Sequence, residues 1–456
     1  MRHSRRLDLG FVLVLGLAAR ITYLVIWGGL DAQLHDSLSD QFIYLDIADN
    51  LAEGDGFTVS GETWIADPGQ PTSIMPPLYP LVLGGLFKLW GHSILAARLL
   101  GLALSCLVPV FAYLIAERLQ GRRAGLLAGA VAALYPPLVM YARPLMSEAI
   151  FLPLLGLLAY ITLRLLDDRP SPVTWLTWGV VAALAILTRT EAGLLVPALM
   201  GFVLIARYRR FRLDRAALVR RWLLSLVALG LVLSPYSLYN YQAHGNPMPL
   251  PNAKWKMWDH TWLADARTRP EWQGVGLPER QIVPDWEDKT ERERDAYLWK
   301  LAVKFVRENP GTYAEQRIRR VFWSYPLLPL EELREPQPSD GAAFGSTSLD
   351  DTVRYATPAE RIRVWSFRAM FLGALAGFVY YALARRDSRF LVLGIFIAWN
   401  VVHSALFVGS ERLRIQIDLF LIVLTAAALI SLWYALKDRG RLKREEGGAL
   451  SLAGAK

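Results

Sequence analysis

Two carboxylates beside long apolar blocks have the chemistry for proton transfer. Asp40 follows the first apolar block by about ten residues, and Glu148 stands where a later block begins. A carboxylate near a reacting hydroxyl or amine can take its proton, so Asp40 is the candidate catalytic base and Glu148 a second catalytic carboxylate that orients an acceptor or a metal. The alternatives are a solvated loop position or helix N-cap for Asp40 and headgroup water for Glu148. Rival bases are Asp36, Asp46 and Asp55.

Three arginines stand at similar borders and have the chemistry for anion binding. Arg412 and Arg414 open the last apolar block, and Arg189 lies in a short turn between two blocks. The planar guanidinium matches a phosphate group, so all three are candidate phosphate-binding residues. The alternatives are that Arg412 and Arg414 extend to lipid headgroups and that Arg189 only forms a local ion pair with Glu191.

Metal-binding and nucleotide-binding patterns are weak in this sequence. His35, Asp36 and Asp40 form an unspecific cluster, so no metal ligand is assigned and a divalent metal ion stays open as a cofactor. The single cysteine, Cys106, allows no intrachain disulfide and no cysteine zinc site. The chain has no phosphate-binding G-x-x-x-x-G-K-[ST] loop, which disfavours ATP-driven transport. It also has no Asp-x-Asp in its polar segments, so a nucleotide-sugar enzyme gains no support.

The elements that must position these side chains are membrane-spanning helices. Of the 456 residues 54% are hydrophobic and 20% charged, with a mean hydropathy of +0.27. About 18 apolar residues in a helix cross a bilayer, so the sequence predicts an all-α, polytopic transmembrane bundle of about ten spans. The segment 78–90 is too short to cross, and we expect it at the membrane surface or re-entering it. The predicted spans are 8–30, 94–116, 124–141, 148–166, 173–189, 191–206, 222–240, 363–384, 389–408 and 415–436.

The placement of basic residues predicts the orientation. Cytoplasmic loops are enriched in Lys and Arg, and the net charge of +9 gathers in alternate loops rather than in a nucleic-acid-binding fold. We therefore expect a multi-pass cell membrane protein with both termini cytoplasmic and the active site outside. The loops predicted inside carry Arg118, Arg122, Arg123, the run 207–221, Arg385, Arg386, Arg389 and the tail 437–444.

The same orientation divides the chain into three parts. Residues 1–240 form an N-terminal transmembrane module with a catalytic first outer loop at 31–92. Residues 241–362 form an outer cap, in which apolar residues at helical spacing stop at Asn309-Pro310-Gly311. Residues 363–456 supply the C-terminal helices and a basic cytoplasmic tail.

Several short motifs together resemble a known family. The chain is similar to the C-type glycosyltransferases that use polyprenyl-phosphate sugars, the bacterial relatives of protein O-mannosyltransferases and of the lipid A aminoarabinose transferase. A departure is Gln41, which stands where a second carboxylate is common. The motifs are Ser39-Asp40-Gln41 with Tyr44, Pro76-Pro77-Leu78-Tyr79-Pro80, Leu145-Met146-Ser147-Glu148, Leu187-Thr188-Arg189, Ser234-Pro235-Tyr236 to Asn240-Tyr241, and Glu411-Arg412-Leu413-Arg414.

The resemblance implies a function. It implies that a sugar is transferred, with inversion, from a polyprenyl-phosphate donor to an envelope lipid, glycan or protein outside the inner membrane. It further implies that Tyr44, Tyr79 and Asn240 bind substrate. The expected partners are the lipid-linked donor, membrane lipids and the acceptor, and no nucleic acid. The alternatives are a flippase or transporter of lipid-linked sugars and a non-catalytic partner in an envelope-glycan assembly complex.

Overall fold

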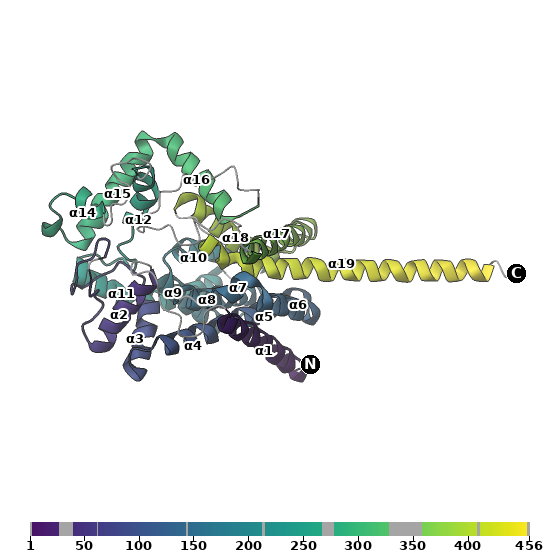
Figure 1. The fold of residues 1–456 in the computed structure, drawn as a ribbon. Coiled ribbons are helices and arrows are strands. Elements are labelled where there is room, and N and C mark those ends of the chain that lie inside the picture. The colour runs from purple at the N-terminus through teal and green to yellow at the C-terminus, as the bar shows by residue number, and fades with distance from the viewer. Residues whose placement is uncertain are drawn as a thin grey trace.

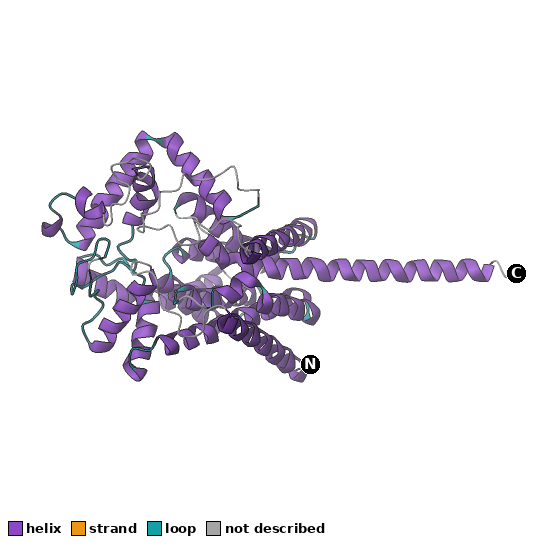
Figure 2. Cartoon of the chain, in the orientation of Figure 1, coloured by secondary structure: helices purple, strands orange, loops and turns teal. Residues whose placement is uncertain are grey.

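The computed structural model describes most of the chain. The described residues are 2–26, 40–61, 63–142, 145–211, 215–266, 278–327, 358–407 and 411–453. Their secondary structure is helical apart from turns and three isolated β-bridges within 58–71 (Figure 2). The predicted all-α class is therefore confirmed, whereas the rival base Asp36 and the neighbouring His35 lie outside the described residues.

A bundle of helices forms the body of the molecule (Figure 1). Its larger buried apolar cluster joins side chains from nearly all of these helices. The helices are α1 (Arg2–Ile26), α4 (Ile94–Ser105), α5 (Leu107–Gln120), α6 (Arg122–Leu134), α7 (Pro136–Met140), α8 (Glu148–Leu165), α9 (Pro172–Thr188), α10 (Ala192–Phe211), α11 (Arg215–His244), α17 (Pro358–Phe378), α18 (Ser388–Leu406) and α19 (Glu411–Ala453).

The lengths of these helices confirm a polytopic membrane bundle. Within the described residues, seven helical segments are long and apolar enough to cross a bilayer, and α9 and α10 are among the shorter apolar helices. The predicted span 124–141 is in fact two helices, α6 and α7. They break at Tyr135, whose extended backbone (φ −65°, ψ 117°) is the conformation that a following proline favours.

A smaller group of helices forms a cap on one side of the bundle. The predicted break at Asn309 is confirmed, because α15 ends at Glu308 and Pro310 begins the next helix, where its missing N–H costs nothing. In Figure 1 the cap lies opposite the two ends of the chain. Its helices are α12 (Trp255–Trp258), α13 (Ala264–Ala266), α14 (Pro278–Ile282), α15 (Glu291–Glu308) and α16 (Pro310–Ser324). Of these, α12 and α15 share a buried apolar cluster with α2 (Asp40–Glu53) and α3 (Leu78–Trp90) of the segment 31–92.

Helix α2 is held in place by α3, which has the bounds predicted for the short apolar segment. The two helices touch at Gly84, where an added Cβ would lie 2.9 Å from Cβ of Leu51 and 3.1 Å from the carbonyl oxygen of Ala48. Only glycine permits this approach. This packing fixes α2 against α3, and the first described residue of α2 is Asp40.

Candidate active site

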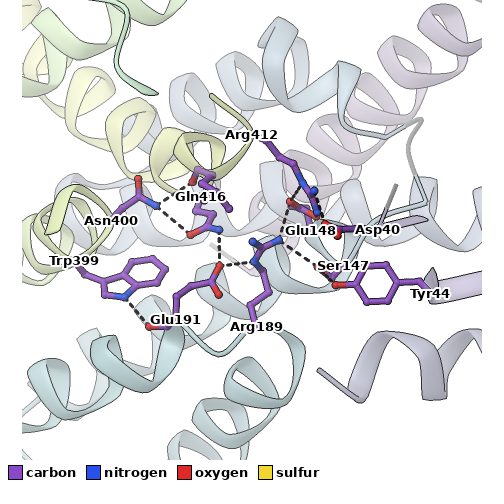
Figure 3. Close-up of polar contacts among 11 residues, drawn as sticks. Asp40, Tyr44, Ser147, Glu148, Arg189, Glu191, Trp399, Asn400, Arg412 and Gln416 are labelled. Carbon is purple, nitrogen blue, oxygen red and sulfur yellow. Dashed lines mark hydrogen bonds and ion pairs between the residues drawn. The ribbon is translucent and has the colours of Figure 1, made fainter. Parts of the chain in front are cut away.

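The ends of five helices meet at one place (Figure 3). Asp40 is the first residue of α2 and Glu148 the first residue of α8, while Glu191 directly precedes α10. Arg189 follows the last residue of α9, and Arg412 is the second residue of α19. Helix N-termini favour carboxylates and C-termini favour cations, so each of the first four charges suits its helix end. Arg412 opposes its helix dipole and depends on its anionic partners.

Arg412 joins the two predicted catalytic carboxylates. Its Nη1 donates to Oδ2 of Asp40 at 2.7 Å, and its Nε donates to Oε1 of Glu148 at 2.6 Å. A second bond from Nη2 reaches Oε2 of Glu148 at 3.3 Å, so the Glu148 pair is bidentate. Such charge-assisted pairs are the stronger hydrogen bonds in proteins. The structure thus brings Asp40, Glu148 and Arg412 together from distant parts of the sequence.

Arg189 extends this cluster on its other side. Its Nη1 donates to Oε1 of Glu148 at 2.8 Å, and its Nε donates to Oε1 of Glu191 at 2.5 Å. The local pair with Glu191 that the sequence allowed is present, but it is one link in a larger network. Because the Glu148 side chain is only 1% exposed, it needs both guanidinium groups to offset the cost of burying its charge.

Polar side chains inside the bundle support Glu191. Gln416 donates to Oε1 of Glu191 at 3.2 Å, and Asn400 donates to Gln416 at 3.1 Å. Tyr325 in turn donates to Asn400 at 2.6 Å, and the ring N–H of Trp399 donates to the Glu191 carbonyl at 2.8 Å. The sequence analysis missed these residues. Their only signal was that polar side chains are rare and usually paired within membrane-spanning segments.

The electrostatics of Asp40 follow from its partners. Burial by itself would raise the pKa of the Asp40 carboxyl, but the positive charges of Arg412, then Lys256 and Arg189, outweigh burial and lower the pKa to about 2. Asp40 is therefore a carboxylate at every physiological pH. While Arg412 is bound to it, this carboxylate is a weak base, since an effective base has a pKa near the working pH.

Two predicted substrate-binding tyrosines border the cluster. The hydroxyl of Tyr44 donates to Oγ of Ser147 at 3.3 Å, directly beside Glu148. The rings of Tyr44 and Tyr79 meet edge to face with centroids 5.0 Å apart, and both side chains are buried. Burial raises the pKa of Tyr44, so its hydroxyl stays protonated and can donate a hydrogen bond.

Two other predicted site residues lie apart from this cluster. Arg414 donates to Asp418 at 3.0 Å and stacks on the ring of Phe367, with 4.0 Å from Cζ to the ring centroid. Asn240 accepts a bond from Ser73 at 2.6 Å and donates to the carbonyl of Met248 at 2.7 Å. In this structure Arg414 is packed inside the bundle and Asn240 links loops of the cap.

The rival carboxylates on α2 and after it also lie elsewhere. Asp46 accepts the backbone N–H of Ser60 at 2.8 Å and so holds the loop that follows α2. Asp55 stands on the exposed turn after α2, where its backbone N–H donates to the Asn50 carbonyl at 2.8 Å. Asp40 is the member of this group that meets the arginine cluster.

The cluster is a poor fit for a divalent metal ion. A hard cation needs several oxygen ligands around it, but the guanidinium of Arg412 already bridges the carboxylates of Asp40 and Glu148. Among the described residues, no group of three or more His, Cys, Asp or Glu side chains is arranged to hold a metal. The chemistry below is therefore derived from the side chains alone.

Comparison with known proteins agrees with this architecture. Residues 75–239 match the family model for dolichyl-phosphate-mannose-protein mannosyltransferases. The resemblance to C-type glycosyltransferases is confirmed. The matched segment contains Glu148 and Arg189, while Asp40 and Arg412 lie on either side of it. No curated protein sequence matches the chain.

Solved structures share the fold at low sequence identity. The oligosaccharyltransferase AglB from Archaeoglobus fulgidus, in complex with an inhibitory peptide and a dolichol phosphate, aligns with a TM-score of 0.55 and 14% identity over 97% of this chain. An A. fulgidus oligosaccharyltransferase in complex with Zn and sulfate aligns with a TM-score of 0.55 and 12% identity over 95% of this chain. ArnT from Cupriavidus metallidurans, bound to undecaprenyl phosphate, has a TM-score of 0.41 and 16% identity, with 92% of this chain and 78% of that one aligned.

The match to the archaeal enzymes is partial on their side. This chain covers 52% of AglB and 50% of the zinc complex, so it spans about half the length of the oligosaccharyltransferases. At these identities the likeness establishes the fold.

Proposed function

We propose that the protein is a membrane glycosyltransferase that moves a sugar from a polyprenyl-phosphate donor to an acceptor outside the inner membrane. The observation that carries this proposal is the bridge from Arg412 to Asp40 and Glu148. A carboxylate beside a guanidinium supports the proposal, because transfer from a lipid phosphate requires a proton acceptor and a cation that stabilises the phosphate. The acceptor classes are an envelope lipid, a glycan or a protein.

The donor's phosphate binds to Arg412 and Arg189 in this proposal. Glu148, buried and bonded to both arginines, positions them so that their N–H groups face one ligand. Once the phosphate shares the guanidinium of Arg412, the positive charge that Asp40 experiences is reduced. The pKa of Asp40 then rises from about 2 toward its ordinary value. Donor binding thereby converts Asp40 from an ion-pair partner into a base.

Transfer is then a single displacement. The acceptor's oxygen or nitrogen forms a bond to the anomeric carbon, and its proton passes to Asp40. The bond from the anomeric carbon to the phosphate oxygen breaks on the opposite side, and polyprenyl phosphate leaves with the electron pair. The arginines stabilise the charge that develops on the leaving phosphate. Attack opposite the leaving group inverts the anomeric centre.

Tyr44 and Tyr79 are proposed to border the sugar. Their rings meet edge to face, and the hydroxyl of Tyr44 bonds to Ser147 beside Glu148. Asn240 acts at a distance in this scheme, since it holds Ser73 and the cap loops rather than contacting the cluster.

The placement of the chain ends supports the predicted orientation. The N-terminal end of α1 and the C-terminal end of α19 lie on one side of the bundle, and the cap and α2 lie on the other (Figure 1). With both termini in the cytoplasm, the Asp40 cluster is at the outer surface of the membrane. The phosphate of a polyprenyl-phosphate donor in the outer leaflet lies at this surface. The dolichol phosphate in the AglB complex supports a lipid-phosphate donor.

Substitution of Asp40 tests the proposed function. Asp40→Asn removes the base, and we expect transfer of a labelled sugar from polyprenyl phosphate in isolated membranes to fall by about 10²- to 10⁴-fold. Asp49→Asn is the matched control, because Asp49 is on the same helix and pairs with the exposed His92 at 2.7 Å. Full transfer by the Asp40→Asn protein would reject Asp40 as the base.

A further inference from the structure

Two cations meet an aromatic pair where α6 packs beside α19. The guanidinium of Arg123, near the start of α6, lies 4.9 Å from the ring centroid of Trp433, and its Nη1 donates to the hydroxyl of Tyr434 at 2.8 Å. The ammonium of Lys437 lies 5.3 Å from the ring centroid of Trp433. Both distances to the ring are within the range of cation–π attraction. Two positive charges are therefore held beside one indole, and we refer to these four side chains as the border group.

The border group lies where α19 leaves the membrane. By the rise of about 1.5 Å per residue, Tyr434 lies about 33 Å from Arg412 along the helix, close to the thickness of a bilayer's hydrocarbon core. The apolar span of this helix ends at Lys437. The start of α6 is beside the N-terminal part of α1, because Arg122 pairs with Asp8 at 2.6 Å. Since tryptophan and tyrosine are enriched at the border of a bilayer, the group is at headgroup level on the side of the chain termini.

The cations of the border group differ from their neighbours in their partners. Three other arginines at this end of the bundle each pair with a carboxylate, in the pairs Arg5–Glu117, Arg122–Asp8 and Arg118–Asp167. Among the side chains that the structure describes, no carboxylate is within ion-pairing distance of Arg123 or Lys437, and both residues are exposed. Arg123 is also the second residue of α6, where the helix dipole disfavours a cation. An anion at this place offsets both kinds of repulsion.

An apolar stripe of α19 runs from the border group toward the middle of the span. Leu429, Leu432 and Leu436 are exposed, and they recur at helical spacing on the face that carries Trp433. Lys437 is one turn beyond Trp433 on the same face. A chain of lipid that lies along this stripe therefore has its headgroup at the two cations. The stripe and the charges together match the apolar and anionic parts of one phospholipid molecule.

We propose that the border group binds the phosphate of an anionic phospholipid, whose acyl chains lie along Leu429 and Leu432. The lipid belongs to the leaflet on the side of the chain termini, which is the inner leaflet in the proposed orientation. Basic pockets between membrane-spanning helices recognise anionic headgroups in this way. The inference goes beyond sugar transfer and does not depend on it, because the border group and Arg412 are at opposite ends of the span of α19.

The test is binding of dioleoylphosphatidylglycerol, an anionic lipid, to the full-length protein in detergent, with the lipid-bound species measured by native mass spectrometry. We expect Arg123→Gln and Lys437→Gln each to raise the Kd by about fivefold, the usual contribution of one basic residue near an anionic membrane surface. The variant with both changes raises the Kd by about thirtyfold. The charge-conserving variant Arg123→Lys, Lys437→Arg keeps most of the affinity.

The matched control is Lys300→Gln, Lys304→Gln, which removes the same number of positive charges from exposed positions on α15 of the cap. Equal melting temperatures for the two double variants exclude a folding defect, and where they differ the single variants carry the comparison.

Three results overturn the inference. The first is a variant with both Arg123 and Lys437 replaced that binds the anionic lipid as tightly as the control. The second is equally tight binding of the zwitterionic lipid dioleoylphosphatidylcholine to the wild type. The third is a protein dimer that the variant at Arg123 and Lys437 loses, because a second copy of the chain then covers this face.

Discussion

Two arginines on one helix have opposite surroundings. Arg412 and Arg414 are two positions apart on α19, and at about 100° per residue their side chains leave the helix in nearly opposite directions. Arg412 reaches Asp40 on α2 and Glu148 on α8. Arg414 is 2% exposed and pairs with Asp418, one turn further along its own helix.

The difference lies in where the partners come from. The partners of Arg412 belong to other helices and meet it at the border of the bundle, where its side chain is 14% exposed. A ligand can therefore share its N–H groups. The pair of Arg414 and Asp418 is local and enclosed, and a buried pair of this kind contributes mainly by avoiding an unpaired charge. Residue type and position in the sequence do not separate a site residue from a structural one here.

Replacement of Arg412 has the largest expected effect. Arg412→Gln removes the cation that joins Asp40 and Glu148, and we expect sugar transfer per folded molecule to fall by about 10²- to 10³-fold. Arg414→Met leaves the cluster intact, so transfer per folded molecule stays within a few-fold of the wild type. The measurement is the initial rate of transfer in liposomes, divided by the amount of monomeric folded protein. Equal losses in the two variants would erase the distinction between the two arginines.

Replacement of Arg414 has its expected effect on stability instead. Arg414→Met removes the guanidinium that pairs with the buried carboxylate of Asp418, and breaking a buried ion pair on one side costs about 3–5 kcal/mol. The double variant Arg414→Met, Asp418→Leu removes both charges and recovers much of this loss. Thermal unfolding in detergent measures both steps. A single variant that melts like the wild type would show that the pair is not structurally important.

Glu291 contrasts with Asp40, because the groups that donate hydrogen bonds to its carboxylate are neutral. Glu291 on α15 accepts bonds from Thr72 at 2.6 Å, from the backbone of Ser73 at 2.9 Å and from Asn252 at 2.8 Å. Whereas the cations near Asp40 lower its pKa to about 2, burial raises the pKa of Glu291 to about 7 despite these hydrogen bonds. His244 lies 4.0 Å from Glu291, and the negative charge of Asp295 opposes the ionisation of Glu291.

The pH dependence of cap stability is the smallest expected effect. A carboxyl whose pKa is raised on folding stabilises the fold fully below its ordinary pKa of 4.5, and this contribution is lost as the pH rises through about 7. Glu291→Gln cannot ionise. We therefore expect the melting temperature of the variant, relative to the wild type, to rise by a few °C between pH 5 and pH 8.5. A constant difference across this range would mean that Glu291 does not titrate there.

Much of the candidate site could be predicted from residue type and position. Ionisable residues are conspicuous at the borders of apolar blocks. This feature predicts four members of the candidate site, namely Asp40, Glu148, Arg189 and Arg412. The same reasoning also selected Arg414, because two neighbouring arginines at one border look alike until their helix is packed.

The sequence by itself determined the helical class, the polytopic bundle, the short helix at 78–90 and the break at Asn309. These depend on local quantities: the length of an apolar run against the thickness of a bilayer, and the missing N–H of a proline. Only the tertiary structure decided which charges meet. The contacts of Arg412 with Asp40 and Glu148 join residues hundreds of positions apart. Such partners are chosen by how the helices pack, because a buried charge stays only where the packed structure supplies its counter-charge.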